Sequence, residues 1–325
     1  MAFHEQVDAL LAAGRTGEAV AVAERAAAAG DGEALTLLAT WRLVGNPLPR
    51  DLPAARALLA RARALGHRGA AQMEIALTGN GSGADGPDWA GALALLRAAA
   101  EGEPAARAQA ALLDAMALHG DGSPARLPSP EPLAPNGAVQ RFPGFLSPAE
   151  CGHVARAASG LLEPAVVVDP ATGRQVRHPH RTSDGAVLGP TREDPVVRAI
   201  NLRIAAASGT HVDQGEALTI LRYVPGQQYR PHHDSLPGTR NQRVKTMLLY
   251  LNEGFGGGET TFPAYKLSIR PRGGDAVLFT NTRADGRPDP AALHAGEPVT
   301  QGAKWLATRW IRARPFSLWT GPEVA

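Results

Sequence analysis

Hydrophobic and polar residues follow two different patterns along the chain. In residues 1–120, apolar residues, mostly Ala and Leu, recur at intervals of three and four, which is typical of amphipathic helices. From residue 216 onward, short segments rich in β-branched and aromatic residues are separated by Gly, Pro and Asn, which indicates strands joined by turns. The sequence therefore predicts an α-helical part followed by a β-rich part.

The helical part also has a long period. Three glycines follow Ala/Leu-rich segments at a constant step of 36 residues: Gly30, Gly66 and Gly102. A period of this size is typical of solenoids built from helix pairs, and residues 5–118 resemble the Sel-like relatives of the tetratricopeptide repeats. An unrelated Ala-rich helical bundle is the alternative. A solenoid would offer a concave surface to a peptide or protein.

A proline-rich segment follows the helical part. Five prolines lie between residues 121 and 137, a density that neither a helix interior nor a central strand tolerates. We interpret it as a stiff linker. The predicted domains are therefore a helical-repeat domain over 1–120, a linker over 121–138 and a third region over 139–325.

The third region begins with helix signals and continues as strands. Ser147, Pro148 and Glu150 have the spacing of an N-cap, a first-turn proline and a capping box, and residues 195–208 form a second helical pattern. Five strand-like segments follow: 216–224, 243–252, 266–271, 275–281 and 305–312. Strands without intervening helices favour an antiparallel jelly roll. The predicted fold class is α+β multidomain: an α-helical repeat solenoid followed by a double-stranded β-helix (jelly roll) with flanking helices.

Composition and charge exclude several classes of function. The chain has 325 residues, a formal net charge of +2 and a single cysteine, Cys151. No apolar run reaches 18 residues, and the first residues lack a basic segment followed by an apolar one, so we expect neither a transmembrane helix nor a secretory signal. We expect a cytoplasmic protein without a disulfide, a nucleic-acid partner or a membrane partner.

The informative chemistry lies around residue 232. On a strand, residues i and i+2 face the same way, so His232 and Asp234 share a face. A histidine on a later strand-like segment, His294, would complete the 2-His-1-carboxylate triad that holds non-haem Fe(II) with open positions. His-x-Asp alone is a weak motif, and a solvated turn is its ordinary alternative. The later His294, with Lys304 ten residues beyond it, makes a metal site the stronger hypothesis.

Lys304 is a candidate residue for binding an anion. It shares a predicted strand face with apolar and aromatic residues, and a lysine on the inward face of a barrel is costly unless an anion meets it. The dicarboxylate 2-oxoglutarate would supply that anion, with its keto acid end on the iron.

Six stretches between residues 142 and 316 carry a family pattern, in this order: Phe145–Cys151, Arg181–Ser183, Tyr223–Asp234, Gln242–Asn252, Gly257–Pro263 and His294–Trp310. Together they resemble the 2-oxoglutarate/Fe(II) dioxygenases of the prolyl 4-hydroxylase catalytic-domain type. The pattern covers a little over half of the chain.

This resemblance implies a role for each matching residue. The metal ligands would be His232, Asp234 and His294. The residues for 2-oxoglutarate would be Lys304 and Thr260 at its distal carboxylate and Tyr223 near its iron-binding end. The residues lining the peptide channel would be Arg243, as a catalytic residue, with Tyr229 and Trp310. Two departures from the family pattern, Arg312 in place of a frequent His and Thr219 in place of a common Gln, affect the substrate contacts.

The implied function is hydroxylation of prolyl residues in a peptide or protein. The reaction would use Fe(II), 2-oxoglutarate and O2, with ascorbate (vitamin C) as reductant, and couple decarboxylation of 2-oxoglutarate to succinate with C–H hydroxylation. The helical repeats are the candidate part for holding the substrate. The alternatives are hydroxylation of a free amino acid or a small peptide natural product, and a non-catalytic scaffold based on the repeats.

Overall fold

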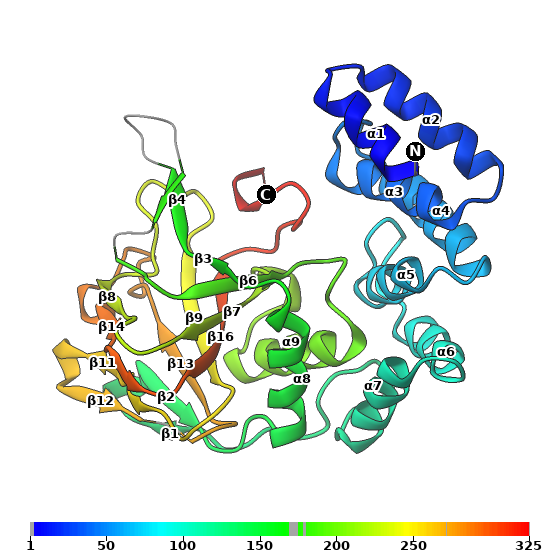
Figure 1. Ribbon diagram of the computed structural model, residues 1–325. Helices are drawn as coiled ribbons and strands as arrows, with labels where there is room; N and C mark the ends of the chain where they lie inside the picture. The colour runs from blue at the N-terminus through cyan, green and yellow to red at the C-terminus, as the bar shows by residue number, and fades with distance from the viewer. Residues whose placement is uncertain (1–2, 169–174, 178–179, 271, 325) are drawn as a thin grey trace. The chain divides into compact units, whose positions relative to one another are not determined.

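The computed structural model in Figure 1 describes residues 3–168, 175–177, 180–270 and 272–324, and it divides into two compact units. The helical unit holds the chain up to Met116 together with the short segments Gly120–Gly122 and Pro190–Arg198. The β-rich unit holds Ala117–His119, Ser123–Gly189 and the chain from Ala199 onward.

The helical unit is a series of helices in which each one packs against the next along the chain. Their bounds are α1 Phe3–Ala12, α2 Thr16–Ala28, α3 Gly32–Val44, α4 Leu52–Ala64, α5 Arg68–Asn80, α6 Trp89–Ala100 and α7 Pro104–Ala115. The starts of α3, α5 and α7 lie 36 residues apart. Their relation to Sel-like repeats remains a prediction.

A small residue at a fixed place in each of these three helices explains the period. Ala34, Ala70 and Ala106 are each the third residue of their helix, and all three are buried. A methyl side chain at this point lets the neighbouring helix approach closely, so alanine recurs at this position in every second helix from α3 to α7.

The described part of the β-rich unit contains two main antiparallel sheets and two short two-stranded ones, of which one pairs β10 Gly256–Gly257 with β15 Val299–Gln301. The large sheet has the order β1-β2-β13-β9-β16-β7-β6-β3, and the small sheet has the order β12-β11-β14-β8. The large-sheet strands are β1 Glu131–Pro132, β2 Val139–Phe142, β3 Glu163–Pro164, β6 Asp184–Leu188, β7 Leu218–Tyr223, β9 Arg243–Tyr250, β13 Ala276–Thr280 and β16 Lys304–Arg312. The small-sheet strands are β8 Tyr229–His232, β11 Thr260–Phe262, β12 Leu267–Ile269 and β14 His294–Gly296.

The two sheets share one hydrophobic core. Leu248, Phe279 and Leu306 from the large sheet pack in the same buried cluster as Phe262 and Ile269 from the small sheet. Strands with alternating side chains bury one face each, and two such faces together form the sandwich. The predicted double-stranded β-helix is confirmed.

The flanking helices also match the prediction. Helix α8, Pro148–Ser159, begins with the full capping box of Ser147 and Glu150, and α9 spans Pro195–Ser208. Glu150 also forms a buried ion pair with Arg203 at 2.6 Å, so the capping residue ties α8 to α9. None of the helices in the described part of the chain combines the length and apolar character needed to cross a membrane.

Residues 160–190 contain strands that the sequence patterns did not indicate. Their described part includes the edge strand β3, the strand β4 Val166–Val168 paired with β5 Gln175–Arg177, and β6. Strand β6 is paired along its whole length with β7. Its first two residues, Asp184 and Gly185, carry a turn signal. The pairing with β7 outweighs that local preference, which a single sequence does not reveal.

Candidate active site

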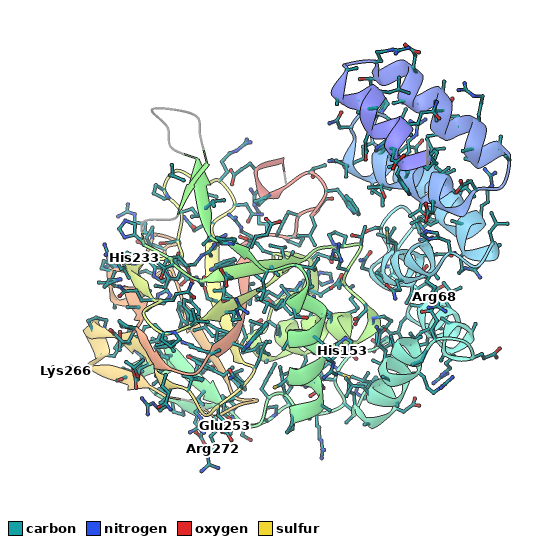
Figure 2. All side chains as sticks on the ribbon, in the orientation of Figure 1. Arg68, His153, His233, Glu253, Lys266 and Arg272 are labelled. Carbon is teal, nitrogen blue, oxygen red and sulfur yellow. The ribbon has the colours of Figure 1, made fainter. Side chains whose placement is uncertain are left out.

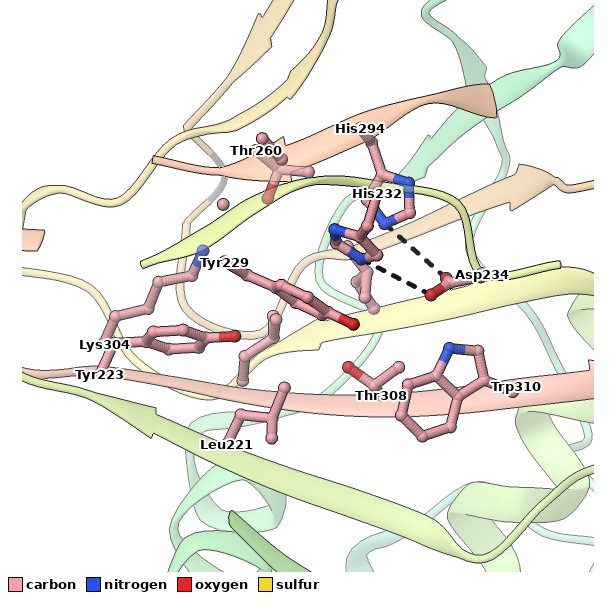
Figure 3. Close-up of a pocket in the computed structure, with 14 residues that line it drawn as sticks. Leu221, Tyr223, Tyr229, His232, Asp234, Thr260, His294, Lys304, Thr308 and Trp310 are labelled. Carbon is pink, nitrogen blue, oxygen red and sulfur yellow. Dashed lines mark ion pairs between the residues drawn. The ribbon is translucent and has the colours of Figure 1, made fainter. Parts of the chain in front are cut away.

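Three metal-ligating side chains meet at one end of the small sheet (Figure 3). His232 ends β8, Asp234 lies in the turn just after it, and His294 begins β14, where it is the register partner of His232. The Asp234 carboxylate oxygens lie 3.6 Å from Nε2 of His232 and 3.7 Å from Nε2 of His294. Among the described residues, this is the one group of His, Cys, Asp or Glu with metal-site spacing.

Backbone carbonyls orient both imidazoles. Nδ1 of His232 lies 2.8 Å from the carbonyl of Arg230, and Nδ1 of His294 lies 3.0 Å from that of Ala292. Because a carbonyl only accepts, each Nδ1 carries the proton and each Nε2 keeps its lone pair beside Asp234. This is the arrangement that metal-binding histidines use, so the donor set fits a divalent metal such as Fe(II).

A buried chain of hydrogen bonds supports Asp234. The Thr246 hydroxyl donates to its Oδ2 at 2.7 Å, and Nδ2 of Asn281 donates to the Thr246 hydroxyl at 2.9 Å. Neither residue was predicted from the sequence, since they lie on β9 and just after β13 and belong to no ligand motif. Their one signal is a polar residue within an otherwise apolar strand segment.

The charges of the triad suit a cation. Burial would raise the pKa of the Asp234 carboxyl, but His294, His232 and the Thr246 hydrogen bond together hold that pKa below its usual range. Burial, followed by repulsion from His294, lowers the pKa of His232 to about 4. At neutral pH the site therefore offers the Asp234 carboxylate and a neutral His232 imidazole, which are the forms that bind metals.

A cavity opens beside the triad between the two sheets. Its atom-free space, which includes solvent at the open mouth, is about 400 Å³. It is lined by Leu221, Tyr223, Tyr229, His232, Asp234, Leu248, Thr260, His294, Ala295, Gly296, Lys304, Leu306, Thr308 and Trp310. All predicted site residues except Arg243 are in this set. The alternate residues of β16 from Lys304 to Trp310 face the cavity, as the strand period predicts.

Lys304 forms the polar end of the cavity opposite the triad in Figure 3. It is 2% exposed, and Nζ donates to the carbonyl of Gly258 at 2.7 Å. The rings of Tyr223 and Tyr250 lie 5.7 Å and 5.4 Å from Nζ. No carboxylate in the described ranges lies within ion-pair distance of it. Burial lowers the pKa of Lys304 to about 8, and the more distant charge of Glu259 only partly opposes this. A buried ammonium without a direct ion-pair partner fits the carboxylate of a bound ligand.

Two hydroxyl groups lie beside this lysine. The Thr260 hydroxyl and the Tyr250 hydroxyl are 2.6 Å apart, and both residues are buried. Thr260 was predicted from the sequence, whereas Tyr250 was not, because a tyrosine within an apolar strand reads as a core residue. The lysine and this hydroxyl pair together could hold a carboxylate.

Aromatic rings flank the triad. The ring of Tyr229 stacks on that of His232 with the centroids 3.4 Å apart, and Trp310 lies on β16 beside Asp234 (Figure 3). The predicted catalytic residue, Arg243, lies with its guanidinium 4.1 Å from the Trp310 ring and is bound by Glu216 at 2.6 Å and 2.8 Å. Arg243 therefore contacts the wall of the cavity and not its interior.

His233, the residue between His232 and Asp234, does not line the cavity. His233 is exposed at the surface (Figure 2), as the alternation of a strand predicts for the residue between two ligands.

Comparisons with known proteins point in one direction. Residues 218–312 match the family model of the 2OG-Fe(II) oxygenase superfamily. Prolyl 4-hydroxylase 1 of Arabidopsis thaliana is 41% identical over 192 residues, which cover 53% of this chain and 68% of that protein. Prolyl 4-hydroxylase 5 of the same plant is 36% identical over 201 residues, covering 54% and 69%.

Among solved structures, the viral collagen prolyl hydroxylase vCPH of Paramecium Bursaria Chlorella virus-1, in its 2OG complex, is similar to this chain with 28% identity and a TM-score of 0.45. The match covers 55% of this chain and 97% of the viral one.

Proposed function

Because the chain belongs to the prolyl 4-hydroxylase family of 2-oxoglutarate- and Fe(II)-dependent oxygenases, we propose that it hydroxylates prolyl residues in a peptide or protein. The observation that carries this proposal is one cavity with His232, Asp234 and His294 at one end and an unpaired buried lysine at the other. A metal site alone would fit many reactions. A metal site with a carboxylate-binding lysine fits a dicarboxylate cosubstrate.

The triad would hold Fe(II), and Lys304 with Thr260 would hold the distal carboxylate of 2-oxoglutarate. When bound, Fe(II) and 2-oxoglutarate supply the oxidation itself, in which decarboxylation to succinate is coupled to C–H hydroxylation by O2. Lys304 contributes a positive charge at a fixed place, and the Thr260 and Tyr250 hydroxyls contribute donors beside it. Tyr223, a residue that is 4% exposed, closes this end of the cavity against water.

The substrate would enter past the aromatic rings. Tyr229 and Trp310 offer flat apolar faces, which suit a prolyl ring, and Arg243 holds the Trp310 ring in place from its other side. These residues position the target carbon and exclude water from the metal, since a misplaced substrate would leave the oxidation uncoupled. The helical unit is the proposed holder of a longer peptide or protein substrate.

The test is peptide-stimulated succinate production under air with Fe(II), ascorbate and 2-oxoglutarate. A panel of prolyl peptides is compared with matched alanyl peptides, and mass spectrometry looks for one added oxygen on the proline. We expect stimulation by prolyl peptides only, and its loss in His232→Ala. His233→Ala is the matched control, because it removes the adjacent exposed imidazole and should keep activity. Hydroxylation of free proline, with none on any peptide, would contradict the proposal.

A further inference from the structure

Two arginines and one glutamate meet behind the Trp310 wall of the cavity, and we call Arg243, Arg312 and Glu216 the arginine cluster. Arg243 begins β9 and is the register partner of Arg312 at the end of β16. Glu216 precedes β7, and its backbone N–H donates to the carbonyl of Trp310. Three adjacent strands of the large sheet therefore bring these charges together.

A β-bulge explains why Arg243 joins Arg312 in the cluster. Between Ile311 and Arg312 the partner on β9 moves by two residues, from Lys245 to Arg243, so Val244 is the extra residue. A bulge re-aims side chains of its own strand, and Arg243 thereby reaches Glu216 beside Arg312.

The charges in the cluster do not balance. Oε1 of Glu216 accepts from Nε of Arg243 at 2.6 Å and from Nε of Arg312 at 2.5 Å, and Oε2 accepts from Arg243 at 2.8 Å. Across the described chain, Glu216 is the one acidic side chain paired with either guanidinium. The side chains of Arg312, Arg243 and Glu216 are only 5%, 16% and 17% exposed. A surplus positive charge in such a place favours an anion close by.

The surplus charge lies against the cavity wall. The guanidinium of Arg243 is 4.1 Å from the centre of the Trp310 ring, and this ring lines the cavity.

We propose that the site prefers a peptide with a carboxylate next to the target residue, and that Arg312 sets this preference as a positioning residue. This inference rests on the proposed prolyl hydroxylation. Arg312 occupies Oε1 of Glu216, so the one carboxylate of the cluster is shared between two guanidiniums and Arg243 keeps part of its charge for the substrate. The substrate carboxylate could be an Asp or Glu side chain or a free C-terminus, and the same donors would bind either.

The experiment compares three peptides of equal length with one proline each. The first has Asp or Glu beside the proline and an amidated C-terminus, the second has Asn or Gln there and is also amidated, and the third ends at the proline with a free carboxylate. KM and kcat are measured from succinate production at saturating 2-oxoglutarate. We expect a KM about tenfold lower for the first peptide than for the second, from the strength of charge-assisted hydrogen bonds. The third peptide shows which carboxylate source is used.

Variants assign the effect to Arg312. In Arg312→Gln the KM ratio between amide and carboxylate peptides should fall to about threefold or less, with KM changing more than kcat, and Arg312→Lys should keep most of the ratio because it keeps the charge. Arg287→Gln, which removes a side chain that is 83% exposed, is the control and should leave the ratio unchanged. Far-UV circular dichroism checks that each variant is folded.

Two results would overturn the inference alone. One is equal KM values for the carboxylate and amide peptides in the unmodified protein. The other is an unchanged ratio in folded Arg312→Gln. If no peptide stimulates succinate production, the proposed prolyl hydroxylation fails, and this inference fails with it.

Discussion

The two ends of the cavity are built in opposite ways. At the metal end, each ligand is fixed from outside: His232 and His294 by backbone carbonyls, and Asp234 by the hydroxyl of Thr246. At the lysine end, the ammonium of Lys304 has one carbonyl and two aromatic rings around it and no carboxylate partner in the described chain.

The difference shows which end depends on its ligand. The metal end is complete before anything binds, because the two imidazoles and the carboxylate are already held in fixed orientations. The lysine end holds a buried charge whose partner must arrive with the cosubstrate. We therefore expect changes at Lys304 to act on ligand affinity and changes behind Asp234 to act on the metal.

The largest effect should come from Lys304→Met, which keeps the length of the side chain and removes its charge. The proposed buried ion pair with the distal carboxylate is broken on one side, which costs about 3–5 kcal/mol and raises the Kd for 2-oxoglutarate about 100-fold or more. Calorimetric titration of 2-oxoglutarate under anaerobic conditions with bound metal measures it.

The metal affinity of Lys304→Met should stay within a few-fold of that of the unmodified protein, and this is the internal control. Lys304→Arg should recover part of the 2-oxoglutarate affinity. A Kd that rises less than fivefold in Lys304→Met would mean that the carboxylate binds elsewhere.

A smaller effect should follow at the other end from Thr246→Val, which replaces the hydroxyl by a methyl group of similar size. Loss of an outer hydrogen bond to a ligand typically lowers metal affinity 10- to 100-fold. Titration with Co(II), followed by its visible absorption, measures the Kd directly. Thr246→Ser keeps the hydroxyl and should bind metal nearly as the unmodified protein does; equal losses in both variants would show that packing, and not the hydrogen bond to Asp234, matters.

These two ends also differ in how far the sequence reveals them. The ligand spacing, the inward lysine and strands β7, β9, β13 and β16 could all be predicted, because each is a local pattern of period two or a short motif. Thr246 and Asn281 could not, since their contacts join residues 12 and 35 positions apart and no pattern marks them. The outer support of a site depends on strand pairing, and strand pairing is what single-sequence patterns leave open.

Arg243 shows the same limit. It was predicted as a catalytic residue from a motif, and its guanidinium lies against Trp310 and Glu216. A motif gives the position of a residue in a strand. The direction of its side chain depends on the residues of neighbouring strands and on the bulge at Val244.

The smallest predicted effect is the pH dependence of 2-oxoglutarate binding, which should involve the lysine end and not the metal end. Burial lowers the pKa of Lys304 to about 8, so above pH 8 the ligand-free protein loses the charge that the distal carboxylate needs. The Kd for 2-oxoglutarate should be constant below pH 7.5 and rise about tenfold for each pH unit above 8. Binding at pH 8.5 should take up a proton, which calorimetry in two buffers of different ionisation enthalpy detects.

The affinity for 2-oxoglutarate should fall as pH rises above 8, whereas the free energy of unfolding should rise. Between pH 8 and the ordinary lysine pKa of 10.5, the unfolded chain binds more protons at Lys304 than the folded chain does. The contribution of this residue to the free energy of unfolding therefore rises with pH across that window and stays at its lowest value below pH 8. Lys304→Arg is the control for both measurements, because its guanidinium stays charged and should give a flat 2-oxoglutarate profile from pH 7 to 9.5. A Kd for the unmodified protein that does not change over this range would show that the lysine stays charged before the ligand binds, and would remove the difference between the two ends.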